Sequence, residues 1–345
     1  AALAAGPMLA QADVKLYGLV HVSVDYLDGK GAGSASAPDN SRKSLGVASN
    51  TSRWGIDVSE KLGGGLTAIA KMEQNLDATG ETNSQNSHNR YVGLKGKFGT
   101  ILAGIHDTPF KDIRGKTDLF GDQVGDARNL VGGTDNSSLG WDLRPTNVIK
   151  YSTPSLNGFE LAYLHSTDTS TGAPDDNRRR ADSLGLSYVG GPLYVAYAHE
   201  THRFSTIADT GNPTETGDRI GASYKIGAFL LSGMWMEAKD MGGTAAGGSS
   251  VKRKSWSLGG AYAAGNNVFK LQYVKADDRS NNSAGASQPN TGANMWAIGW
   301  DHLFSKTAKA YIAYARTDNG TSSALRVNGG GHAASDGVTP ATGND

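Results

Sequence analysis

The amino-acid sequence predicts an all-β fold, a transmembrane antiparallel barrel, and three observations support this prediction. Segments in which apolar and polar residues alternate recur along the chain, as expected of strands with one face toward lipid and one toward water. Short turns alternate with long polar loops, a pattern that a soluble sheet has no reason to follow. The chain has 47 glycines and 38% hydrophobic residues, and it contains no apolar run long enough for a transmembrane helix.

The composition also excludes several classes of function. Basic and acidic residues balance at 33 each, so no bulk positive field favours nucleic acid as a partner. Cysteine is absent, which rules out disulfide frameworks and thiolate metal sites and is compatible with export through an oxidising compartment. We therefore expect no nucleic-acid partner, no cofactor and no metal site.

The chain is expected to divide into a short leader and one barrel domain. Residues 1–12 are typical of the end of a signal peptide, and Ala10, Gln11 and Ala12 fit the small-x-small cleavage pattern. An ordinary alanine-rich tail remains the alternative. The barrel is expected over residues 13–345, and the leader implies export.

The first strands follow in order. A strand is predicted over 14–26, and a polar loop then continues to about residue 50. The strands over 53–60 and 66–73 are joined by a tight glycine turn, and each alternates cleanly. Because side chains change face at every residue, the polar members of these strands are expected to point into the lumen. They are Arg53, Asp57, Lys71 and Glu73.

The same rhythm continues to the end of the chain. Long loops are expected around residues 78–88, 168–181, 204–217, 240–253, 278–292 and from 318 onward. The count gives about fifteen strands, whereas bacterial single-chain barrels are normally even-numbered. The last clear strand lies near 309–315, so we expect sixteen strands in the fold with the final one missing from this sequence. An overcount by one is the alternative.

One connection differs from all the others. About forty residues, from 107 to 145, separate the strands near 100–106 and 147–151. Loops of this length in compact domains are usually functional or disordered. This loop mixes charges of both signs with glycine, and we expect it to fold into the lumen and narrow the pore. Its candidate constriction residues are Asp118, Asp122 and Asp126.

Four stretches, at 14–18, 52–66, 91–100 and 144–154, resemble the Gram-negative general porins, specifically the trimeric sixteen-stranded branch of neisserial and burkholderial type. The resemblance implies a ladder of basic residues on the barrel wall facing acidic groups on the third loop. It places Arg53 and Arg144 on that wall, and either His88 or Arg90 at the next basic position. Asp57 stands where family members often carry a basic residue, which leaves the ion preference open.

The resemblance further implies a homotrimer in the outer membrane of a Gram-negative bacterium, in contact with lipid and lipopolysaccharide. Its function would be passive diffusion of ions and small hydrophilic solutes, with selectivity set by a charged constriction. A substrate-specific porin with a dedicated solute site is the main alternative, and a soluble glycan-binding β-protein is another. An outer-membrane enzyme is disfavoured, because the chain has neither a Gly-x-Ser-x-Gly elbow nor a His-Glu-x-x-His pair.

Overall fold

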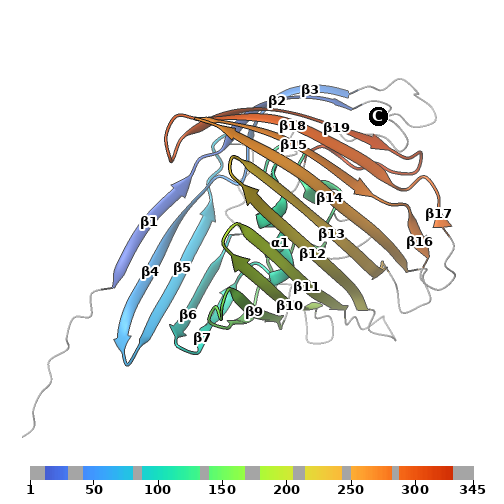
Figure 1. Ribbon diagram of the computed structural model, residues 1–345. Coiled ribbons are helices and arrows are strands. Elements are labelled where there is room, and N and C mark those ends of the chain that lie inside the picture. Colours follow the sequence, from blue (N-terminus) through green and yellow to red (C-terminus); the bar gives the residue numbers. More distant parts are fainter. Residues whose placement is uncertain are drawn as a thin grey trace, which may run out of the picture.

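The computed structural model describes residues 12–29, 42–80, 88–132, 140–167, 179–204, 214–242, 250–281 and 287–328. Almost all of the predicted leader therefore lies outside the described residues. The fold is all-β, and one large antiparallel sheet curls around a lumen that contains helix α1 (Pro109–Thr117) (Figure 1).

Each strand pairs antiparallel with the strand that follows it in space. In chain order the strands are β1 (Asp13–Leu19), β2 (Val22–Gly29), β3 (Arg42–Ser49), β4 (Arg53–Gly63), β5 (Leu66–Asn75), β6 (Arg90–Gly96), β7 (Gly99–Ile105), β8 (Val148–Ser152), β9 (Phe159–Ser166), β10 (Arg179–Gly190), β11 (Leu193–Phe204), β12 (Thr214–Ile226), β13 (Phe229–Met241), β14 (Val251–Ala264), β15 (Asn267–Ala276), β16 (Arg279–Asn281), β17 (Ser287–Gln288), β18 (Ala293–Leu303) and β19 (Lys309–Asn319).

Several of these strands continue one another across a bend. The β1–β4 and β2–β3 pairings form one long hairpin, and the Asn50 amide donates to the His21 carbonyl at the bend (2.8 Å). Strands β15 and β16 likewise form one arm of a hairpin, and β17 and β18 form the other. The described residues therefore contain fifteen long strand segments, which confirms the count made from the sequence.

The two ends of the sheet lie near each other. The His21 ring and the Tyr311 hydroxyl are 2.9 Å apart and connect the first hairpin to β19. Among the described residues, however, no ladder of backbone hydrogen bonds joins β1 to β19. The sheet is thus open along this edge, and a sixteenth strand remains a prediction.

The two faces of the sheet differ in polarity, as the alternation predicts. On β9, Phe159, Leu161 and Tyr163 are exposed on the outer face, whereas Leu164 is buried on the inner face. The outer face carries many exposed apolar side chains, among them Leu16 at 71% exposure. Since a soluble monomer rarely exposes so much contiguous apolar surface, this face suits lipid.

The long loop contains the helix that the sequence analysis did not predict. Thr108 caps α1 by accepting from the Lys111 amide (3.2 Å), and Pro109 occupies the first turn, where its missing N–H costs nothing. A second element, the 3₁₀ helix η1 (Ala127–Asn129), follows. Among the described residues, no helix has both the length and the apolar character that a membrane span requires.

Candidate pore constriction

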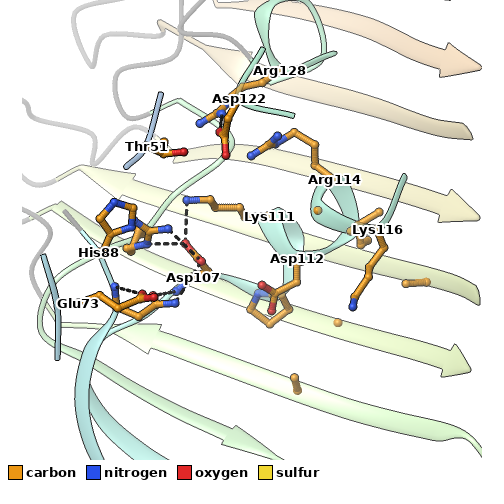
Figure 2. A pocket seen from close by; sticks show the side chains of 18 of the residues that line it. Thr51, Glu73, His88, Asp107, Lys111, Asp112, Arg114, Lys116, Asp122 and Arg128 are labelled. Atoms are coloured by element: carbon orange, nitrogen blue, oxygen red, sulfur yellow. Dashed lines mark hydrogen bonds and ion pairs between the residues drawn. The ribbon is translucent and has the colours of Figure 1, made fainter. Parts of the chain in front are cut away.

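The long loop lies inside the curled sheet and leaves a cavity of about 1090 Å³ beside it. Side chains from the loop line one side of this cavity, and side chains from the wall strands line the other (Figure 2). The lining mixes basic, acidic and small polar residues. Such a passage admits water and polar solutes and acts on their charge.

A group of ionisable side chains, here called the Asp107 cluster, joins both ends of the loop to the wall. Arg144 donates to Asp107 from Nε (2.8 Å) and Nη2 (3.2 Å), and the Lys111 ammonium lies 2.7 Å from the same carboxylate. Arg144 Nη1 also lies 3.1 Å from His88 Nδ1. The beginning and the end of the loop are thereby held together, and Figure 2 shows Asp107 between His88 and Lys111.

Proton equilibria in this cluster follow from its surroundings. Burial raises the pKa of Asp107, but the positive charges of Lys111 and Arg144 outweigh it and hold that pKa below its usual range. Burial, together with the neighbouring Arg144 and Arg53 charges, lowers the pKa of His88 to about 4. At neutral pH the cluster therefore contains an ionised aspartate and an uncharged histidine.

Wall strands β4 and β5 carry two ion pairs of their own. Arg53 Nε lies 3.5 Å from Glu73, and Lys71 lies 3.0 Å from Asp57. Lys71 also donates to the Tyr17 hydroxyl (2.9 Å). Within the part of the chain that the structure describes, these basic residues are therefore paired with acidic residues of the wall and not with the loop aspartates.

The opposite face of the loop is held by a buried set of charges, here called the Arg219 network. Arg219, on β12, donates to Asp142 (2.6 Å) and to the carbonyls of Phe110 (3.1 Å) and Val131 (2.9 Å). Arg114 lies 3.0 Å from the other oxygen of Asp142. Burial raises the pKa of Asp142, but Arg219 and Arg114 outweigh it and keep that pKa below its usual range.

Two further aspartates extend this network within the loop. Arg114 Nη1 lies 3.4 Å from Asp118 and 3.5 Å from Asp126. Asp126 is fully buried, caps η1 by accepting from the Arg128 amide (2.8 Å), and also accepts from the Arg128 guanidinium (2.9 Å). These carboxylates thus fix the conformation of the loop.

Close packing explains where α1 lies on the wall. A Cβ added at Gly217 would lie 2.6 Å from the Trp141 ring, and one at Gly221 would lie 2.3 Å from Ile113. Behind the loop, Trp141 stacks on His202 with ring centroids 4.3 Å apart. Gly217 and Gly221 on β12 therefore allow the long loop, including α1, to pack closely against the wall.

The structure brings some of the predicted site residues together and separates others. The cavity lining includes Arg53, Glu73, His88, Asp122 and Arg144. Asp118 lines a separate cavity of about 350 Å³, and Asp57 and Lys71 pair with each other on the wall. Arg90 shares the outer strand face with exposed Val92, and buried Asp126 lines neither cavity.

Several residues of the site were not singled out from the sequence. Asp107, Lys111, Lys116 and Glu160 line the cavity, and Arg219 holds the loop in place. Strand alternation places Glu160 and Arg219 on the inner face, and the Thr108–Pro109 pair is a helix-start signal. In the described part of the chain, no group of three or more His, Cys, Asp or Glu side chains could hold a metal ion.

An apolar outer wall, a polar lumen and a loop folded inside it define a channel-forming membrane protein of the β-barrel class.

Comparisons with known proteins identify the family. The model of the Gram-negative porin family matches residues 1–322. Outer membrane porin protein 32 of Delftia acidovorans is 30% identical, and the match covers 94% of this chain and 90% of that protein. The major outer membrane protein P.IB of Neisseria sicca is 25% identical over 90% of both chains.

The fold is also found among solved structures. An anion-selective porin from Comamonas acidovorans superposes with a TM-score of 0.77 at 24% identity, covering 97% of this chain and 96% of that one. The chain belongs to the Gram-negative porin family, as the sequence motifs indicated. It is an outer-membrane porin, and its family consists of channels rather than enzymes.

Proposed function

We propose that this porin is a passive diffusion channel for ions and small hydrophilic solutes, and that a charged constriction sets its selectivity. The supporting observation is the loop seated in the lumen, which leaves a cavity of about 1090 Å³ with charged residues on both sides. Solutes would be sorted by size at the loop and by charge along the lining. No chemical step is required.

The partners follow from the same proposal. The exposed apolar outer face needs either lipid or another barrel against it, and a homotrimer would supply the second. A structural neighbour from Vibrio cholerae is described in a trimer form. The remaining outer surface would face outer-membrane lipid and lipopolysaccharide.

A substrate-specific porin is the second candidate. Such a site would present stacked aromatic rings or another dedicated binding surface to the solute. In the described residues, the ring contacts of the loop join Phe110 to Trp141 and Trp141 to His202, and these rings are buried behind the loop. This arrangement favours the general channel.

Single-channel recording of the full-length protein in a planar bilayer tests the proposal. We expect stepwise ohmic conductance with long open times, and insertion of three channels at a time if the porin is trimeric. Conductance that saturates at low concentration of one solute would instead support a substrate-specific porin. A folded protein without conductance would refute the channel function altogether.

A further inference from the structure

Most of the charges that line the cavity are neutralised at short range. The close pairs are Arg53 with Glu73 (3.5 Å), Lys111 and Arg144 with Asp107 (2.7 and 2.8 Å), Lys150 with Asp112 (3.1 Å) and Arg128 with Asp122 (2.9 Å). A close pair acts on a passing ion as a short dipole, and the field of a dipole falls off faster with distance than that of a single charge. One-to-one pairs therefore contribute little to the field in the middle of the passage. The Asp107 cluster has two cations on one carboxylate, but its cations are only 13% (Lys111) and 19% (Arg144) exposed.

Two charges of the lining differ from these pairs. Lys116 lies in the last turn of α1, Glu160 is the second residue of β9, and both are exposed. Neither forms an ion pair with any residue that the structure describes. Figure 2 shows the Lys116 side chain extending away from the Asp107 cluster. Asp77, another lining residue, instead accepts hydrogen bonds from Thr79 and Gly80.

Exposure adds to this difference. In water, a lone fixed charge changes the local concentration of a monovalent ion about 4 Å away roughly fivefold. Screening over a Debye length of about 10 Å weakens this effect at 0.1 M salt. Three of the paired side chains are less accessible to such an approach, since Arg53 is 31% exposed, Arg144 19% and Glu73 9%. Asp112 is 51% exposed, but its charge is neutralised by Lys150 at 3.1 Å. A permeating ion in the cavity therefore approaches Lys116 and Glu160 most directly.

We propose that Lys116 and Glu160 are the residues that set the ion preference of this channel. Lys116 favours anions and Glu160 favours cations, so each offsets the other in the native protein. This arrangement of charge is the reverse of a basic wall facing an acidic loop. In the described lining, the unpaired cation, Lys116, is on the loop, and the unpaired anion, Glu160, is on the wall. This inference rests on the proposed channel function.

The test is the reversal potential across a gradient of about 0.1 M against about 0.01 M KCl, where screening is weak. We expect Lys116→Gln to lower the chloride-to-potassium permeability ratio by about twofold and Glu160→Gln to raise it by about twofold. The double variant should return close to the native ratio. As a matched control, Lys71→Gln combined with Asp57→Asn removes a wall ion pair that lines neither cavity and should leave the ratio unchanged.

The outcomes separate this inference from the proposed function. Native-like conductance with an unchanged ratio in both single variants would overturn the roles of Lys116 and Glu160 and leave the channel function standing. A larger shift in Arg53→Gln than in Lys116→Gln would overturn them too. Absence of conductance in the folded native protein would refute the channel itself, and this inference with it.

Discussion

The constriction loop has a buried face and a cavity face, and the same types of residue act differently on each. On the buried face, Arg219 and Asp142 are almost completely inaccessible and each has several partners. On the cavity face, Lys116 is exposed and Asp112 retains 51% of its side-chain exposure. Buried charges are costly when they lose a partner, whereas exposed ones are stabilised by water. The buried face should therefore hold the loop, and the cavity face should act on solutes.

Arg219→Met should separate the two faces most clearly. It leaves Asp142 with one cation instead of two and removes donors from the carbonyls of Phe110 and Val131, at a cost of about 3–5 kcal/mol. We expect the loop to leave the wall, so that single-channel conductance rises and the thermal midpoint falls. Arg144→Met is the matched control, because Lys111 still neutralises Asp107 there. Native conductance in Arg219→Met would contradict a role for the buried face in holding the loop.

A smaller effect is expected from Asp126→Asn. The substitution keeps the shape of the side chain but removes the charge that accepts from Arg128, and such bonds contribute about 2 kcal/mol. The result should be a noisier open channel and a lower thermal midpoint. Asp122→Asn, at a side chain 32% exposed, should cost less than about 1 kcal/mol and leave the noise unchanged. Equal effects of the two variants would argue against the distinction between the faces.

The sequence predicted the sheet far better than it predicted the loop. Strand alternation is a local signal with a period of two residues, and it accounts for the exposure of Phe159, Leu161 and Tyr163 on the outer face. The same rule assigned Lys71 and Glu73 to the inner face, where the structure also has them. It could not choose between His88 and Arg90, because residues two positions apart in a strand face the same side. The structure separates them because β6 begins at Arg90, so His88 lies before the strand, where alternation does not apply.

The path of the loop depends on contacts that no local pattern contains. Arg219 meets Asp142 across 77 positions of the sequence, and neither residue differs in its local surroundings from an ordinary solvated charge. Asp118 and Asp126 were candidates for the lumen because they are acidic, yet the threading of the loop directs them toward Arg114. Only α1 had a readable signal, in its proline at the first turn and its capping threonine.

The acid response of His88 sharpens the comparison on the cavity face. Its pKa is lowered to about 4 in the folded protein by burial and by the Arg144 and Arg53 charges, against about 6.5 in an unfolded chain. Between these values the unfolded chain binds a proton that the folded protein does not. The stability contributed by neutral His88 is therefore complete above pH 6.5 and is lost as the pH falls toward 4.

This linkage predicts a difference between the native protein and His88→Gln. The thermal midpoint of the native protein should fall more than that of the variant between pH 7 and about pH 4.5. The Asp107 carboxylate stays ionised in this window, because Lys111 and Arg144 hold its pKa below the usual range, so it does not produce the difference. An equal fall in thermal midpoint for both proteins would show that His88 is not held neutral beside Arg144. The Asp107 cluster would then be as open to solvent as the rest of the cavity face.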